Sequence, residues 1–545
     1  MLLLTAVAAA SFFLLYVLDR YATGGSAKGV EAGPIAQYFI FDQDHITDAI
    51  SGLGSMIAAV LGIVITVVSI VVQLSAERYT GVTAMFFRDR TNIRVLGFYV
   101  VACVSGVWVS LSLKADFVPR VTLVAMLLTT IVGLVMMGPY FAYVFRFLEP
   151  SSIVARIERD AVETARHGSQ GDSATVVRAQ AQALVAMEEL FDITSNSISG
   201  KDKIIASRAV DALKDLAINY LPHKRTAQRE WFEIAGALRE NPDFVAMDPE
   251  SRLDLETRKT WFEWKVFRQY LGIYNEALSS MRDICYLVAI DTRYVAEAAA
   301  ELGDDELVEL SLRYMNSYLR ATLNAKEVRT AYNLLNQYRL LVESLLRQGD
   351  DRHATAAVGH MKYYAHVSHD MKLPFVMETI AYDVAAICQL AHDLGSPIEE
   401  SLVRVFLEVD RAGDARTHDQ ALKGVRKAQA KLASYYLSVG ATAPARRIHD
   451  DMAHEPPIRL RAIRNELLAV ESKDFWEIID RGRNFEYVPE PQRKAMREFF
   501  GWFAGIEDEP VPASRTATAM GDATSPPPSE AAFEAASEAA SEAAE

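Results

Sequence analysis

A column of small and polar side chains runs through one long apolar part of the sequence, around VLGIVITVVSIVVQLSAERY (60–79). Its members are spaced by 4, 3, 4, 3 and 4 residues and are Ser55, Ala59, Gly62, Thr66, Ser69 and Gln73. On a helix this period of about 3.5 residues aligns the side chains in one continuous seam. Such a seam can line a path for ions or water, or it can be the surface at which helices pack closely.

Depth in the bilayer favours packing. On a helix centred near residue 61, Gln73 would lie about 17 Å from the centre, just beyond a ~15 Å half-thickness of hydrocarbon. Thr66 and Ser69 lie deeper, but their hydroxyls can donate to carbonyls of the preceding turn. No ionisable residue, the usual mark of a transport path, occurs within 49–74. We therefore predict a packing seam and keep a pore as the alternative.

Acidic residues precede this stretch, where FDQDHITD places Asp42, Asp44 and Asp48 at its outer mouth. In an oligomer, a ring of these carboxylates would concentrate cations. Alternatively, Thr47 or Asp48 caps the helix and the other acids favour its positive N-terminus. One histidine and three aspartates form a weak pattern for a metal site. We prefer capping and predict no metal ligands.

Four apolar segments can position these residues in a membrane, namely 1–18, 49–74, 95–113 and 121–147. Each is about long enough to cross a ~30 Å hydrocarbon core at about 1.5 Å per residue. No basic residue precedes the first segment, so we predict a retained helix rather than a signal peptide, although its natural start can lie further upstream. Together they form a predicted transmembrane domain over 1–148.

Basic residues give this domain an orientation. The loop 75–94 contains four arginines, whereas the loops 19–48 and 114–120 carry two cations each. Because cations collect on the cytoplasmic side, we predict that 75–94 and everything after 147 are cytoplasmic. The four are Arg78, Arg88, Arg90 and Arg94. They can also meet anionic headgroups while Phe86 and Phe87 enter the acyl boundary.

The run SIVVQLSAERYTGVTAMFFRDRTNIRVLGFYV (69–100) resembles an uncharacterised bacterial family of predicted multi-pass membrane proteins, catalogued as a domain of unknown function. The matching positions are Ser69, Gln73, Arg78, Tyr79, Phe87, Asp89, Arg90, Leu96 and Gly97. The later run EPSSIVARIERDA is similar to it too, and the resemblance covers about 45–215. It implies four membrane helices in a bacterial inner (plasma) membrane and a cytoplasmic domain, with no established activity. A family element, Ser-Pro-Gly-x-Asn-Asp-Pro, corresponds to SISGKDK (197–203), which lacks the prolines and the Asn-Asp pair.

Composition and motifs exclude several function classes. The chain has a net charge of −15, and this charge makes a nucleic-acid partner a poor fit. Its three cysteines, Cys103, Cys285 and Cys388, are too far apart for a disulfide framework or a CxxC metal site. No GxSxG, HExxH, P-loop or GxGxxG motif stands in a credible setting. We predict no enzyme activity, no catalytic residues and no cofactor.

After 148 the apolar spacing is helical, and a longer recurrence follows it. Helices are predicted to end at glycines spaced by 46, 46 and 45 residues, Gly303, Gly349, Gly395 and Gly440. This interval is typical of helix pairs stacked as a solenoid. The unit near 432–457 also resembles a tetratricopeptide repeat. We predict a helical connecting region over 149–260 and a helical-hairpin repeat domain over 261–505.

The segment 506–545 is rich in Ala, Glu and Pro, and we predict a disordered acidic tail there. The whole is predicted to be an all-α membrane protein, a four-helix transmembrane region followed by a cytoplasmic, solenoid-like domain. Two functions are consistent with it. The first is a membrane anchor for a protein-interaction domain, with the lipid bilayer and a protein as partners. The second is an oligomeric ion channel or transporter lined by 49–74, and either can be a homo-oligomer.

Overall fold

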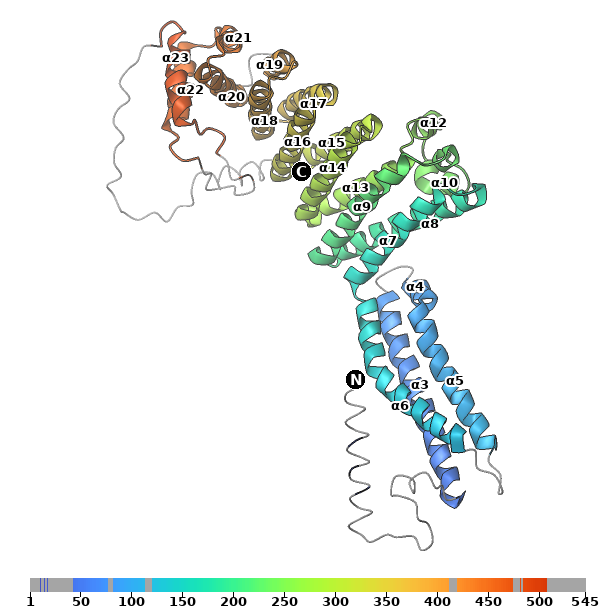
Figure 1. Ribbon diagram of the computed structural model, residues 1–545. Helices are drawn as coiled ribbons and strands as arrows, with labels where there is room; N and C mark the ends of the chain where they lie inside the picture. Colours follow the sequence, from blue (N-terminus) through green and yellow to red (C-terminus); the bar gives the residue numbers. More distant parts are fainter. Residues whose placement is uncertain are drawn as a thin grey trace, which may run out of the picture. The chain divides into compact units, whose positions relative to one another are not determined.

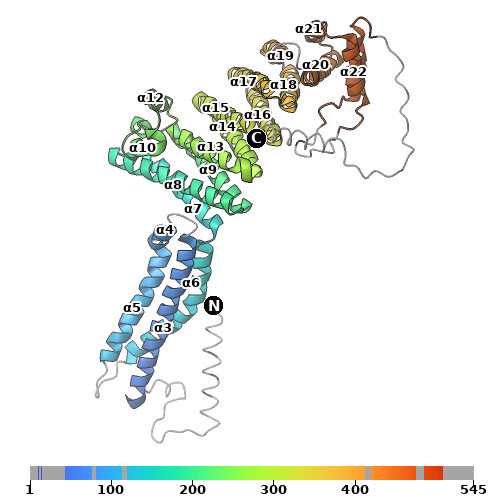
Figure 2. The same cartoon turned by 180° about the vertical axis from the view of Figure 1, so that it is seen from behind.

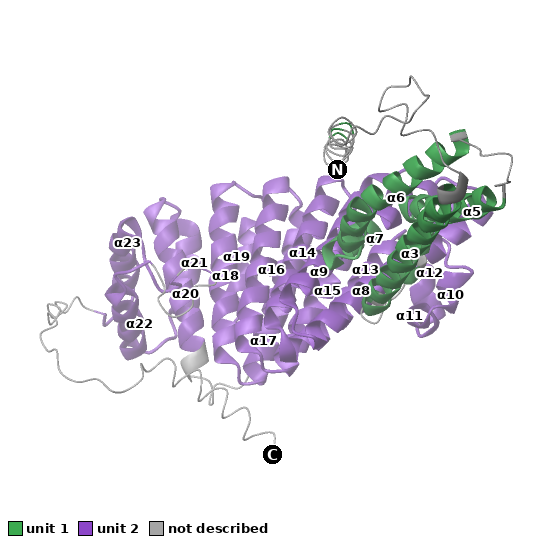
Figure 3. Cartoon of the chain, turned by 90° about the horizontal axis from the view of Figure 1, so that it is seen from below, with its two compact units in different colours: residues 1–157 green, residues 158–545 purple. Residues whose placement is uncertain are grey.

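The structure, a computed structural model, describes residues 43–76, 82–112, 120–410, 419–473, 481 and 484–506, with Ala10, Leu14 and Val17. Helices are the regular elements of this part of the chain, which contains no strand, so the all-α prediction is confirmed for it. The predicted tail lies outside the described residues from 507 onward. The chain divides into two compact units, 1–157 and 158–545 (Figure 3). The predicted division at 260 stays a prediction.

Unit 1 contains three long apolar helices. They are α3 (Gln43–Ala76), α5 (Arg90–Ser112) and α6 (Arg120–Phe147), with the short α4 (Val82–Arg88) before α5 and the start of α7 (Pro150–Gly168) after α6 (Figure 1). All three long helices pack against one another. Branched and aliphatic residues fill one end of their core, among them Ile46, Ile50, Val109, Leu123 and Met126. Burying such side chains stabilises a bundle through close packing.

Three described segments are long and apolar enough to cross a membrane, Ile46–Ser75, Arg90–Leu111 and Val121–Phe147. They correspond to the predicted spans 49–74, 95–113 and 121–147. The first predicted span, 1–18, lies outside the described residues except for Ala10, Leu14 and Val17, which are helical. A count of four spans therefore stays a prediction.

Unit 2 is a succession of antiparallel helices (Figures 1 and 2). After α7, they are α8 (Ser173–Ser199), α9 (Lys203–Lys224), η1 (Arg229–Phe232), α10 (Ala237–Glu240), α11 (Pro242–Val245), α12 (Pro249–Thr257), α13 (Trp261–Ser280), α14 (Arg282–Glu301), α15 (Asp305–Asn324), α16 (Val328–Gln348), α17 (Asp351–Asp370), α18 (Pro374–Asp393), α19 (Glu399–Leu407), α20 (Asp419–Ser438), α21 (Thr442–Met452), α22 (Pro457–Ala469) and α23 (Glu490–Gly501).

The helices from α13 to α21 form two layers within unit 2. One layer contains α14, α16, α18 and α20, each packed on the next, and the other contains α13, α15, α17, α19 and α21 (Figure 3). Helices of the first layer begin at 282, 328, 374 and 419, which repeats the predicted intervals. Each is followed within two residues by a glycine with positive φ, Gly303 (69°), Gly349 (76°), Gly395 (63°) and Gly440 (82°). The predicted left-handed glycine at the end of each helix is therefore confirmed.

A different glycine, Gly168 at the end of α7, is held by close packing. A Cβ added there would lie 2.2 Å from the Cβ of Ala179 and 2.9 Å from Cζ3 of Trp231. We expect Gly168→Ala to lower the free energy of unfolding by about 1–3 kcal/mol, because a crowded core must shift to admit a methyl group. The midpoint of thermal unfolding of the purified protein measures this.

Gly359 provides the matched control for this substitution. It lies inside α17, where an added Cβ meets nothing within 4 Å. Gly359→Ala is expected to raise the unfolding free energy by roughly 0.5–1 kcal/mol, since alanine favours helix over glycine. A Gly168→Ala protein that melts no lower than the wild type would contradict the packing described for α7 and α8.

Candidate functional site

The predicted seam lies on the outer surface of α3. Ser55, Gly62, Thr66, Ser69 and Gln73 are all exposed in the single chain. The buried hydrophobic residues of this helix are Ile46, Ile50, Ile57, Val60, Val64, Val68 and Val72. At about 3.6 residues per turn, the two sets fall on opposite sides of α3. Neither α5 nor α6 covers the seam, so any protein that packs on it must come from elsewhere, and the choice between packing and pore stays open.

The predicted hydrogen bond within the helix is confirmed for Thr66 and stays a prediction for Ser69. The Oγ1 of Thr66 donates to the carbonyl of Gly62 at 2.8 Å. This bond satisfies the hydroxyl within its own helix, so Thr66 does not need a polar neighbour. The seam can therefore face either lipid or another apolar helix.

The outer-mouth acids are only partly described. Asp42 lies outside the described residues, as does the side chain of Asp44, while Asp48 is exposed. The helix begins at Gln43, so Thr47 and Asp48 lie inside its second turn. The prediction that one of them caps the helix is therefore wrong. The predicted apolar segment begins at 49, and α3 extends six residues before it, to Gln43.

The juxtamembrane arginines are exposed wherever they are described. Arg88 ends α4, Arg90 begins α5 and Arg94 follows one turn later, whereas Arg78 lies outside the described residues. Phe87 is exposed too, in line with an interfacial segment. Phe86 is fully buried and packs edge-on against Phe147 at 5.6 Å between ring centroids. The prediction that both phenylalanines enter the lipid boundary is therefore wrong for Phe86.

Asp89, at the break between α4 and α5, joins these helices to α6 and α7. Its Oδ1 accepts hydrogen bonds from the amides of Thr91 at 2.9 Å and Asn92 at 3.1 Å, which caps α5. The same oxygen accepts one from the hydroxyl of Tyr143 at 2.8 Å, and Oδ2 lies 3.5 Å from Nη1 of Arg156. One carboxylate thus fixes four helices of unit 1.

Electrostatics agree with this role for Asp89. Partial burial alone would raise the pKa of its carboxyl, but the hydrogen bonds from Tyr143, Asn92 and Thr91 and the charge of Arg156 hold that pKa below its ordinary value of 3.8. The guanidinium of Arg156 also lies 3.9 Å from the ring centroid of Phe147. The Asp89 carboxylate therefore stays ionised, which its contacts with the donors of α5, α6 and α7 require. The motif Asp-Arg-Thr-Asn is a capping signal that the sequence analysis did not use.

Unit 2 contains a buried ion cluster between its first hairpins. The Nζ of Lys224 lies 2.9 Å from Oε1 of Glu263 and 2.6 Å from Oδ2 of Asp304. Glu263 is fully buried, and this burial raises the pKa of its carboxyl even though Lys224 opposes the shift. One lysine of α9 thereby joins α13 to the turn before α15.

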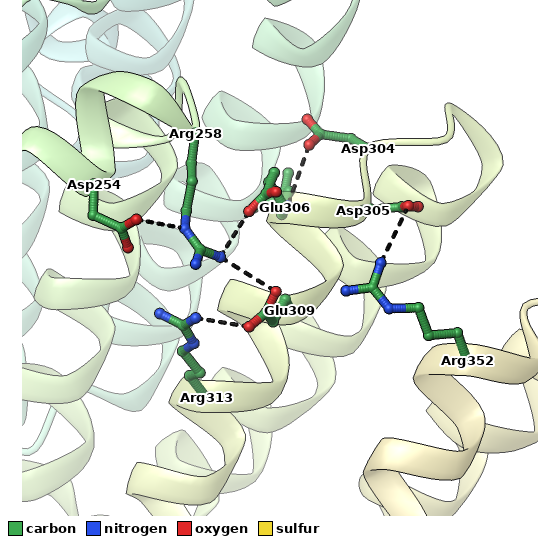
Figure 4. A network of polar contacts seen from close by, with 9 residues as sticks. Asp254, Arg258, Asp304, Asp305, Glu306, Glu309, Arg313 and Arg352 are labelled. Carbon is green, nitrogen blue, oxygen red and sulfur yellow. Dashed lines mark hydrogen bonds and ion pairs between the residues drawn. The ribbon is translucent and has the colours of Figure 1, made fainter.

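A more exposed network of ion pairs involves residues of α15 that follow Asp304 (Figure 4). Arg258 reaches Glu306 at 2.7 Å and Glu309 at 3.2 Å, and also contacts Asp254 at 2.9 Å. Arg313 binds the other side of Glu309 at 2.7 Å. Each acid contacts an arginine, which leaves no unpaired carboxylate cluster in this group. Among the described residues, no group of three His, Cys, Asp or Glu side chains is placed to hold a metal ion.

Asp291 of α14 is a buried acid that contacts Tyr270 and Lys214. The hydroxyl of Tyr270 lies 3.3 Å from its Oδ2, and Nζ of Lys214 lies 3.9 Å from Oδ1. Desolvation raises the pKa of Asp291 from 3.8 to about 7 against the attraction of Lys214. Folding therefore favours the protonated carboxyl, and the stability it contributes is lost as the pH rises towards 7.

Asp291→Asn removes this ionisation and keeps a hydrogen-bond acceptor for Tyr270. Between about pH 5 and about pH 8, we expect the wild type to lose roughly 2–3 kcal/mol more unfolding free energy than the variant. Denaturant titrations at both pH values measure the difference. Asp215→Asn, with a side chain 52% exposed, is the control and is expected to follow the wild type. Parallel pH profiles for wild type and Asp291→Asn would refute the assignment.

Comparison with known proteins gives one match. Residues 1–199 match the model of a family described as Predicted membrane protein (DUF2254). No curated protein and no solved structure matched the chain. The match confirms the predicted resemblance to an uncharacterised membrane-protein family, and it extends to α8 in the structure. Together with the three apolar helices, it identifies a membrane protein.

Proposed function

We propose that the protein is a non-enzymatic membrane anchor that holds a helical-repeat interaction domain at the cytoplasmic face of a bacterial inner membrane. The observation that carries this proposal is the recurrence of helix starts at 282, 328, 374 and 419 in unit 2. Repeats that contact their neighbours in sequence form an extended surface, and such surfaces commonly bind other proteins. In this proposal, the solenoid-like array binds a protein partner.

The chemistry of unit 2 supports a binding role. Two acids whose pKa burial raises, Glu263 and Asp291, lie inside helix contacts, where a substrate cannot reach them. The arginines of the network in Figure 4 are paired with carboxylates. These groups stabilise the helical array by contacts within it. In this proposal, the residues that bind the partner lie on the surface of the array.

Affinity purification from native membranes tests the proposal. The full chain carrying a tag is compared with a chain that lacks 262–503 but retains the membrane helices. We expect at least one protein to be recovered with the full chain and lost with the deletion, while both chains remain in the membrane fraction. Recovery of the same proteins from both would overturn the proposed function.

A second candidate function is an oligomeric ion channel or transporter, and the exposure of the α3 seam favours it. A polar column that no described helix covers can face the axis of a ring of chains. In liposomes containing the purified protein, this function predicts an ion flux that Ser69→Leu and Gln73→Leu abolish. Flux that both variants leave unchanged would rule out this lining.

A further inference from the structure

The connection between α22 and α23 is described at 470–473, 481 and 484–489. It runs over the 20 residues 470–489, although the two helices pack directly against each other. Its described residues contact α20 and also α16 and α18, which are far from α22 in sequence. Arg481 and Phe485 thus join this connection to the first layer of unit 2.

Arg481 is the centre of this contact. Its Nη1 donates to Oδ1 of Asp383 at 2.7 Å, and its Nη2 donates to the carbonyl of Tyr332. The guanidinium carbon also lies 4.0 Å from the ring centroid of Tyr332. The side chains of Arg481 and Asp383 are only 3% and 2% exposed. An arginine from the connection therefore fills a buried acidic site between α16 and α18.

Phe485 and Glu486 extend the same contact. The ring of Phe485 stacks on Tyr382 at 5.0 Å with an interplanar angle of 11°, and it lies 5.8 Å from the ring of Tyr332. The Nζ of Lys431 donates to the carbonyl of Phe485 at 2.7 Å, and Lys427 pairs with Glu486. We call this site the Tyr-Asp-Lys surface, with its members Tyr332, Tyr382, Asp383, Lys427 and Lys431.

The connection does not use the full bonding capacity of the surface. Oδ2 of Asp383 and Nε of Arg481 are both buried without a hydrogen-bond partner. Guanidinium and carboxylate groups can instead form two parallel hydrogen bonds, which are stronger and more specific. If Arg481 leaves, Nε of Arg339 remains 3.4 Å from Oδ1 of Asp383. The Asp383 carboxylate therefore keeps a positively charged neighbour. A better-fitting arginine can therefore replace Arg481 without collapse of the site.

We propose that the Tyr-Asp-Lys surface is a peptide-binding site that the chain itself occupies through Arg481, Phe485 and Glu486. The partner is a protein segment with an arginine, an aromatic residue four positions later and an acid directly after it. That segment displaces the connection and binds Asp383 through both carboxylate oxygens. This inference rests on the proposed function, since it names the chemistry of the partner that unit 2 binds.

A synthetic peptide with the sequence of residues 479–488, IDRGRNFEYV, provides the probe. The full chain in detergent is titrated against the labelled peptide and followed by fluorescence anisotropy. We expect the double variant Arg481→Ala/Phe485→Ala to bind it at least tenfold more tightly than the wild type, because its own segment no longer competes. A scrambled peptide is the control. Equal affinity of the two proteins for the probe would overturn the inference.

Peptide variants test the same contact without altering the protein. A probe with alanine in place of its first arginine is expected to bind the double variant at least tenfold more weakly than the parent probe. Hydrogen exchange supplies a further measurement on the wild type, if the double variant fails to fold. Excess probe should accelerate exchange at the amides of 484–488, and unchanged exchange would contradict displacement.

The outcomes separate this inference from the proposed function. Partners that depend on 262–503, together with no binding of the probe, would remove the inference and leave the proposed function standing. Probe binding without any recovered partner would support the peptide site and count against the anchor as proposed.

Discussion

Lys224→Met is expected to lower the free energy of unfolding by about 3–5 kcal/mol near pH 7.5, because it strands a buried charge. Glu263 is fully buried, and its two carboxylate oxygens have no hydrogen-bond partner apart from the ion pair with Lys224 at 2.9 Å. Asp304, the other acid bound by this lysine, is 21% exposed and retains access to water. The loss therefore comes mainly from Glu263.

The pH dependence of this loss identifies its origin. Burial raises the pKa of Glu263 above its ordinary value of 4.5, against the attraction of Lys224. Removing Lys224 raises it further, and the destabilisation should shrink as the pH falls and the carboxyl takes up a proton. Denaturant unfolding of the purified protein at about pH 5 and about pH 7.5 measures both values.

Two variants control for this result. Lys203→Met breaks an exposed ion pair with Asp283, where both side chains are more than half exposed, and should change the unfolding free energy by less than about 1 kcal/mol. Lys224→Met/Glu263→Gln removes both buried charges and should recover part of the loss. A Lys224→Met protein as stable as Lys203→Met at both pH values would refute the buried-charge explanation.

Gly62→Leu is expected to weaken self-association of the chain at least tenfold, if α3 pairs with a second copy through its seam. Within one chain, a Cβ at this position meets nothing within 4 Å, so the substitution fits the monomer. Small residues allow helix backbones to approach in lipid, and a leucine at the centre of the seam prevents that approach. Light scattering of the protein in detergent and cross-linking in nanodiscs measure the assembly.

Gly97→Leu is the matched control for that experiment. Gly97 is exposed on α5, and an added Cβ there also meets nothing within 4 Å. The same change of side chain therefore adds the same apolar surface away from the seam. If both variants assemble like the wild type, or if the wild type is a monomer, the chain does not associate through the seam and the pore interpretation is excluded.

Sequence reasoning was most successful where the residue itself determines the local structure. The apolar runs predicted three membrane helices that the structure describes, and the glycines at 303, 349, 395 and 440 predicted four left-handed helix ends. The length of an apolar segment and the backbone freedom of glycine are local properties of the chain. They can therefore be recognised in the sequence before the fold is known. Lys326 and Lys372 also adopt positive φ, of 55° and 59°. Lysine has no preference for that region, and those turns were missed.

Contacts between residues that lie far apart in the chain could not be predicted from the sequence. Asp89 lies 54 positions from Tyr143 and 67 from Arg156, and Arg481 lies 98 positions from Asp383. Each residue taken alone matches an exposed charge in a loop, which is the usual place for such a residue. The seam was found because its members share a period, but the period does not say which surface covers it.

Single-particle imaging of the assembly purified gently from native membranes into nanodiscs tests the central claim most directly. The anchor proposal predicts additional density from a second protein on the helical layers of unit 2, lost when 262–503 are deleted. Particles that contain only this chain, arranged as a ring with the α3 seams facing a central axis, would contradict it and favour the channel.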